Sequence, residues 1–107
     1  MSVSTVVTAT GTVTSNVAVL FGLTVSASAA AADPAPTDVA TVTVYDGTST
    51  SGTKVAEMVL MAGSAATPPP VAASEHITFP AGIRCSSGIH VVVTGNGHTV
   101  AVTVDHA

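Results

Sequence analysis

The stretch that decides the fold spans residues 39–46 and reads VATVTVYD. Apolar residues alternate with hydroxyl-bearing or aromatic ones, so Val42 and Val44 point to one face and their neighbours point to the other. Such alternation is typical of a β-strand with one buried face. The stretch ends on Asp46 and is followed by Gly47, a pair that favours a turn. It therefore predicts a strand that runs into a tight loop.

The whole chain shares this preference for β-branched side chains. Among 107 residues there are 19 Val, 17 Thr and 3 Ile, against only 3 Leu. β-branched side chains lose rotamer freedom in a helix and pack well on a pleated sheet. A chain of this length corresponds to one domain. We therefore expect residues 1–107 to form a single all-β domain.

Further strands are predicted where alternation is bounded by turn-forming residues. Residues 54–62 are expected to pair with the first strand, although Val55, Met58 and Met61 also fall at a helical spacing of three. Apolar residues occupy both faces of this segment, which indicates cover from both sides. The other expected strands are residues 3–10, 12–26 with a bend at Gly22, 76–79 ended by Pro80, 89–94 and 99–105.

Seven or eight short strands with antiparallel connections predict a two-sheet antiparallel sandwich, either jelly-roll-like or immunoglobulin-like. The last two strands are expected to form a hairpin in which His90 faces Thr103. Residues 1–11 can serve as an N-terminal arm. The segments 29–38 and 63–74 are predicted to be loops. In residues 12–26 one face is expected to carry Val13, Val17, Val19 and Phe21.

Residues 17–32 resemble a signal peptide, because an apolar run is followed by small residues. The first basic residue, however, is Lys54, so a positively charged leader is missing. The apolar run is also too short for a membrane-spanning helix, which needs about 20 residues. We expect a strand here and no membrane association.

Charged residues make up only 7% of the chain, and the formal net charge is −4. Lys54 and Arg84 are the only basic residues apart from histidine. Nucleic-acid binding requires several cations to neutralise phosphates, so no nucleic-acid partner is expected. An intrachain disulfide is excluded because Cys85 is the only cysteine.

No residue pattern predicts catalysis or a cofactor. Cys85 lies beside Arg84, but nothing in the sequence places a histidine next to it as a base. The six carboxylates are scattered, so neither an acid–base pair nor a calcium loop is indicated. The four histidines, at positions 76, 90, 98 and 106, lack the close spacing of a metal site. We expect no enzyme activity, no cofactor and no metal, while a histidine site shared between subunits stays open.

The core is expected to be weak, because the chain has no Trp, one Tyr and two Phe. Aromatic side chains supply much of the buried area in small domains. Burial against other subunits would add stability by mass action. We therefore expect a homo-oligomer, with a trimer as the first choice. Candidate interface residues, not yet separable from core residues, are Val6, Val7, Phe21, Met58 and Met61.

Two parts of the sequence carry a resemblance to a known group of proteins. Residues 42–48 read VTVYDGT and are followed by SGTKV at 51–55, while residues 79–85 read FPAGIRC and are followed by SGIHV at 87–91. The stretch from about residue 38 to residue 105 resembles small β-sandwich virion proteins of tailed bacteriophages. The resemblance implies a capsid decoration (cement) protein that binds the major capsid protein and bridges capsomers.

Two alternatives stay open. A neck, tail or fibre component of such a particle fits the same resemblance, with other virion proteins as partners. A secreted β-sandwich that binds a carbohydrate or a surface belongs to a different class. The first two functions imply a location in the virion after assembly in the host cytoplasm, whereas the third implies an extracellular location.

Overall fold

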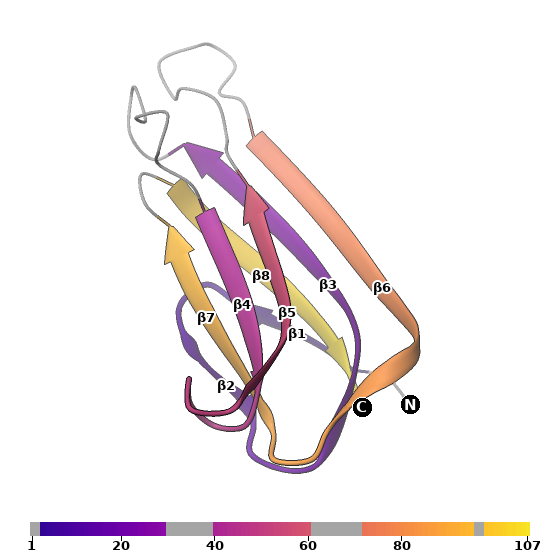
Figure 1. The fold of residues 1–107 in the computed structure, drawn as a ribbon. Helices are drawn as coiled ribbons and strands as arrows, with labels where there is room; N and C mark the ends of the chain where they lie inside the picture. Colours follow the sequence, from indigo (N-terminus) through magenta and orange to yellow (C-terminus); the bar gives the residue numbers. More distant parts are fainter. Residues whose placement is uncertain (1–2, 30–39, 61–71, 96–97) are drawn as a thin grey trace.

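The chain folds into two β-sheets that pack face to face (Figure 1). The computed structural model describes residues 3–29, 40–60, 72–95 and 98–107, and over these ranges it contains strands and no helix. The strands are β1 (Val3–Val7), β2 (Gly11–Thr14), β3 (Ala18–Ala29), β4 (Ala40–Asp46), β5 (Thr53–Leu60), β6 (Ala72–Cys85), β7 (Ile89–Gly95) and β8 (His98–His106).

The pairing pattern is that of one long antiparallel ribbon rolled onto itself. Strand β1 pairs with β8, β2 with β7, β3 with β6 and β4 with β5. Pairing of β3 with β8 and of β4 with β7 then completes the two sheets. We call β1-β8-β3-β6 the β3 sheet and β2-β7-β4-β5 the β4 sheet. The predicted two-sheet antiparallel sandwich is confirmed, and its eight strands follow the order of a jelly roll.

The predicted terminal hairpin is wrong. Strand β7 lies between β2 and β4, while β8 lies between β1 and β3 in the other sheet. His90 is therefore opposite Thr12 and Tyr45 rather than Thr103. Both strands bury one face in the core, through residues such as Val91 and Val102. Their alternation is the same in a hairpin and in a sandwich, so the sequence pattern could not separate the two.

Strand β6 was expected to end at Pro80, but it continues to Cys85. On β6, residues 79–82 lie opposite Phe21 alone, between the pairs Leu20↔Ile83 and Gly22↔Thr78. This bulge leaves Pro80 unpaired, and β6 is an edge strand, where a missing N–H is tolerated. Strand β6 also begins earlier than predicted, at Ala72.

The predicted bend at Gly22 is confirmed, because the pairing of β3 shifts between Leu20 and Gly22 against both neighbouring strands. The shift changes which positions face the core, so the buried side chains are Leu20 before it and Leu23 and Val25 after it. The bulge opposite contains Gly82, whose φ is +75°. A Cβ there would lie 2.4 Å from Val19 Cγ1, so a larger residue would have to displace the Val19 side chain and adopt a backbone conformation that favours glycine.

Residues 12–26 do not form one strand. Strand β2 belongs to the β4 sheet and β3 to the β3 sheet, so the chain changes sheets at residues 15–17. At this change of direction the Asn16 N–H donates to Thr14 Oγ1 over 3.2 Å. The expected common face is wrong in consequence, because Val17 is 57% exposed while Val19 and Phe21 are half-buried.

Strand β5 confirms the prediction of a strand over a helix at residues 54–62, within the part that is described. It pairs with β4, placing Met58 opposite Val42. Both of these side chains are buried, as the alternation in residues 39–46 predicted for Val42 and Val44. The loops predicted at residues 29–38 and 63–74 lie mostly outside the described residues. Where they are described the prediction is wrong, because Ala29 belongs to β3 and residues 72–74 belong to β6.

The core between the sheets is built from small aliphatic side chains. No aromatic residue belongs to its fully buried set, although Phe79 packs against it. Thr43 is the one buried polar residue among those described. The buried apolar residues are Ala18, Leu20, Leu23, Val25, Ala27, Ala40, Val42, Val44, Met58, Leu60, Cys85, Ile89, Val91, Val100, Val102 and Val104.

Candidate functional site

The five predicted interface residues fall into different environments. Val6 is 65% exposed on β1, whereas Met58 is only 4% exposed and belongs to the core. Val7 is half-buried and packs against that core. Phe21 is half-buried on β3, with its ring edge beside Gly82. Met61 lies outside the described residues. Of the described four, Val6 is thus the one with an open surface.

Three further valines are exposed, and sequence reasoning did not select them. Val3 is 51% exposed at the start of β1, while Val17 and Val59 are each 57% exposed. The apolar residues on both faces of residues 54–62 were a usable signal for Val59. Val3 and Val6 lie on the same short strand, so β1 carries two of the four large exposed apolar side chains among the described residues.

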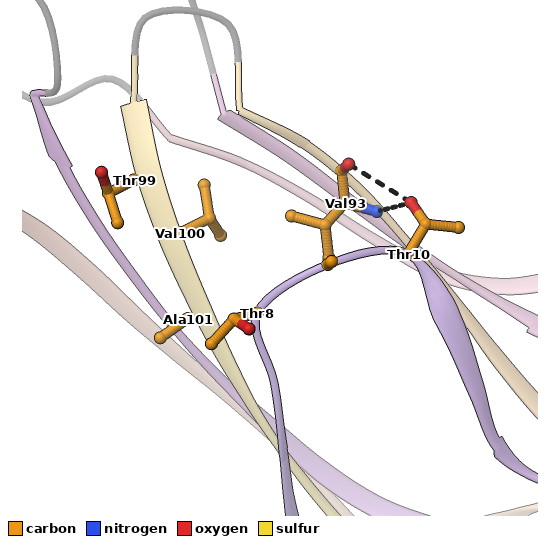
Figure 2. Close-up of a pocket in the computed structure, with 7 residues that line it drawn as sticks. Thr8, Thr10, Val93, Thr99, Val100 and Ala101 are labelled. Carbon is orange, nitrogen blue, oxygen red and sulfur yellow. Dashed lines mark hydrogen bonds between the residues drawn. The ribbon is translucent and has the colours of Figure 1, made fainter.

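A pocket of about 550 Å³ opens where the link between β1 and β2 passes the ends of β7 and β8 (Figure 2). The Val93 N–H donates to Thr10 Oγ1 over 3.0 Å, and the Thr10 hydroxyl donates to the Val93 carbonyl oxygen over 3.4 Å. The described residues lining the pocket are Thr8, Ala9, Thr10, Val93, Thr99, Val100 and Ala101. They offer methyl groups and hydroxyls, with no acid, base or strong nucleophile among them.

Each pair of strands along the ribbon is joined by one threonine hydroxyl. Thr5 bonds His106 Nε2 at 3.0 Å between β1 and β8, and Thr12 bonds His90 Nδ1 at 3.0 Å between β2 and β7. Thr24 bonds His76 Nδ1 at 2.7 Å between β3 and β6, and Thr43 donates to Glu57 Oε2 at 3.1 Å between β4 and β5. These four bonds each add a side-chain contact to the backbone pairing between an edge strand and its inner neighbour.

The histidines thus have structural partners in the described chain. His76 is held on both ring nitrogens, because its Nε2 lies 2.8 Å from Thr78 Oγ1. Among the described residues no three His, Cys, Asp or Glu side chains come close enough to share a metal ion. The side chain of His98 lies outside the described set.

The carboxylates also take part in local contacts. Lys54 Nζ lies 3.1 Å from Glu57 Oε2, and both side chains are exposed. The hydrogen bond from Lys54, aided by one from Thr43, holds the pKa of Glu57 below its usual range. On the outer surface of the β3 sheet, the Ser4 hydroxyl donates to Asp105 Oδ1 over 2.6 Å.

Asp46 organises the end of the sandwich at which the ribbon turns back. The Ser87 N–H donates to Asp46 Oδ1 over 2.9 Å, and the Gly47 N–H donates to the Gly88 carbonyl oxygen over 3.1 Å. These bonds tie the turn after β4 to the turn before β7. The role of Asp46 as a turn residue, expected from Asp46-Gly47, extends here to a second loop.

Cys85 is fully buried. Burial raises the pKa of its thiol, and the Asp46 carboxylate adds to that increase. A nucleophilic cysteine requires the opposite shift, because the thiolate is the reactive form. Arg84, its neighbour in the sequence, is exposed. Cys85 therefore acts as a small core residue.

The sequence matches no protein-family model, and no curated protein gives a significant match. Within the described ranges, no helix has the length and apolar character needed to cross a membrane.

Proposed function

We propose that this chain is a structural protein of a virus particle, a capsid decoration (cement) protein that binds the major capsid protein and other copies of itself. The observation that carries the proposal is a surface with few charged side chains and several exposed valines around an aliphatic core. Val3, Val6, Val17 and Val59 are exposed, and only 7% of all residues are charged. Few charged side chains would lose their hydration when such a surface is buried against neighbouring chains, and burial of unpaired charges is the most costly part of forming a contact.

The fold supports the proposal by analogy. Jelly rolls occur in capsid domains, although also in lectins and in small-molecule-binding proteins, so the strand order alone assigns no function. The pocket near Thr10 is lined by methyl groups and hydroxyls, which suits contact with a protein surface better than catalysis. A decoration protein needs only complementary contact area, and the exposed valines of the sandwich provide apolar surface for such contact.

The proposal is tested on the particles of the phage that encodes the chain. Purified heads are expected to contain the chain by mass spectrometry. Heads from a deletion mutant are expected to release DNA at a lower temperature, and added purified protein is expected to restore the original temperature. Recovery of the chain only in tails would favour the neck, tail or fibre alternative. Recovery only from the culture medium would favour the secreted binding module. Either result would overturn the decoration role.

A further inference from the structure

Asp46-Gly47, at the end of β4, is the only Asp-Gly sequence in the chain. An aspartate followed by glycine is especially prone to isomerisation, because glycine has no Cβ to hinder the approach of its backbone nitrogen to the aspartate carboxyl group. Two groups must be free for this reaction, the Gly47 nitrogen and the Asp46 side chain.

The reaction passes through a cyclic imide and needs no oxidant or cofactor. The Gly47 nitrogen bonds to Asp46 Cγ, and one C–O bond of the protonated carboxyl group breaks. The hydroxyl group and the amide proton leave together as water. A second water then opens the ring at either carbonyl carbon. One opening restores aspartate, and the other gives isoaspartate, in which the main chain passes through Cβ.

In the folded chain both reacting groups are bound to the turn before β7. The Gly47 N–H donates to the Gly88 carbonyl oxygen over 3.1 Å. Asp46 Oδ1 accepts from the Ser87 N–H over 2.9 Å, and the Ser86 hydroxyl lies 3.5 Å from Oδ2. Ring closure would break the bond from Gly47 and turn the carboxyl group away from Ser87.

Backbone atoms also pack closely around the peptide bond itself. A Cβ on Gly52 would overlap the Asp46 carbonyl oxygen, and a Cβ on Gly88 would lie 3.0 Å from the Gly47 carbonyl oxygen. Gly47 is buried and Asp46 is half-buried. The peptide bond therefore has little room for the rotation that brings the nitrogen onto Cγ.

We infer that Asp46-Gly47 is an isomerisation site that the folded chain keeps unreactive and that reacts once the turns after β4 and before β7 separate. Proteins open locally at free energies below that of complete unfolding, so the reaction rate reports how often these turns separate. The inference goes beyond the proposed function and does not depend on it.

Isomerisation also has a structural consequence. Asp46 lies opposite Thr53 on β5 and Ile89 on β7. Isoaspartate adds one atom to the main chain at this point and moves the carboxylate that accepts from Ser87. The turn can then no longer close as before, so molecules that react while unfolded are expected not to refold. Chemical modification of the unfolded state is a common cause of irreversible unfolding.

The first test compares isoaspartate formation at Asp46 by peptide mapping with liquid chromatography and mass spectrometry. The samples are the folded chain, the chain in guanidinium chloride, and a free peptide of residues 42–48. The folded chain is expected to react at least about a hundredfold more slowly than the peptide, and the unfolded chain at a rate similar to the peptide. Equal rates in the folded chain and the peptide would overturn the inference.

The second test loosens the contact between the turns. Gly88→Ala places a Cβ against the Gly47 carbonyl oxygen and is expected to speed isomerisation of the folded chain at least about fivefold. Gly11→Ala is the matched control, because the nearest atom to its Cβ is 3.9 Å away, and no acceleration is expected. Equal rates for the two variants would overturn the protective role of this contact.

Hydrogen exchange at the Gly47 amide of the unchanged chain tests the same contact if Gly88→Ala does not fold. Exchange is expected to be at least about a hundredfold slower than in the free peptide. Exchange as fast as in the peptide would overturn the inference.

The third test measures recovery of the native fold after the chain has been held unfolded for increasing times. Recovery is expected to fall as isoaspartate accumulates at residue 46. Asp46→Ser is the control, because a hydroxyl group can accept from Ser87 but cannot form the imide. It keeps Asn96-Gly97, which also forms imides, so it accounts for damage at that site. Equal loss of recovery in both chains would overturn the expected consequence.

Discussion

At the scale of single residues, the buried thiol of Cys85 makes stability depend on pH. Burial raises the pKa of Cys85 in the folded state, so the unfolded thiol loses its proton first as pH rises. This contribution to the free energy of unfolding is fully present below the ordinary thiol pKa. It is lost as the pH rises towards the higher pKa that Cys85 has in the folded state. We predict that the urea concentration at the midpoint of unfolding decreases once the pH exceeds the ordinary pKa of a thiol.

The control for this prediction is Cys85→Ala, which removes the titrating group. Tyr and Lys side chains also titrate at high pH, so the informative quantity is the difference in slope between the two proteins. The slope of stability against pH should be steeper for the native sequence than for the variant. Equal slopes would contradict a raised pKa at Cys85.

Gly88 illustrates a second residue-scale constraint. Its φ is +122°, and a Cβ there would lie 2.4 Å from the Thr14 carbonyl oxygen. We predict that Gly88→Ala lowers the free energy of unfolding by about 1–3 kcal/mol, measured by urea denaturation. At Gly11 the nearest atom to an added Cβ is 3.9 Å away, so Gly11→Ala should change stability by less than about 0.5 kcal/mol. Similar losses for both variants would argue against strain at Gly88.

At the scale of elements, two neighbouring side chains of β5 face opposite sides of its sheet, one into the core and the other to the surface. Met58 is 4% exposed and Val59 is 57% exposed. We predict that Met58→Ala lowers the free energy of unfolding by about 2–5 kcal/mol, because it leaves a cavity between the sheets. Val59→Ala should cost less than about 0.5 kcal/mol. Comparable losses in thermal or urea denaturation would show that the two side chains do not face opposite sides.

The elements also show what the sequence can predict. Alternation identified β4 and the burial of Val42 and Val44, because each strand must hide one face. It could not identify the strand alongside, since Val91 and Val102 face the same core from different sheets. Pro80 was interpreted as the end of a strand, because a strand tolerates proline within it only at a sheet edge or a bulge. The sequence did not reveal that β6 is an edge strand. That position is a property of the whole fold.

The candidate surface was predictable to a similar degree. Apolar composition and missing aromatic residues predicted incomplete burial at five positions, four of which lie in β1, β3 and β5, while Met61 lies outside the described residues. The division between Val6 on the surface and Met58 in the core required the structure, because both lie in strands with apolar residues on two faces. Charged side chains and proline on an edge strand block its pairing with another chain. This role of Lys54, Glu57 and Pro80 became visible only once β5 and β6 were known to be edges.

At the scale of the whole molecule, the ribbon pairs the two ends of the sequence. Val3 lies opposite His106, so β1 and β8 pair across nearly the whole chain. Long-range pairing requires large loops to close before native contacts form. We predict folding on a timescale of about milliseconds to seconds, measured by stopped-flow circular dichroism because the chain has no Trp. Refolding within microseconds would contradict the rolled-ribbon topology.

The same pairing has a consequence for protein engineering. Since Val3 faces His106, a short peptide linker could join the start of β1 to the end of β8. New ends could then be opened in the exposed turn between β4 and β5, at the far tip of the ribbon. Such a circular permutant would keep every strand pair while moving the attachment point of any fused domain from the β3 sheet to the β4 sheet.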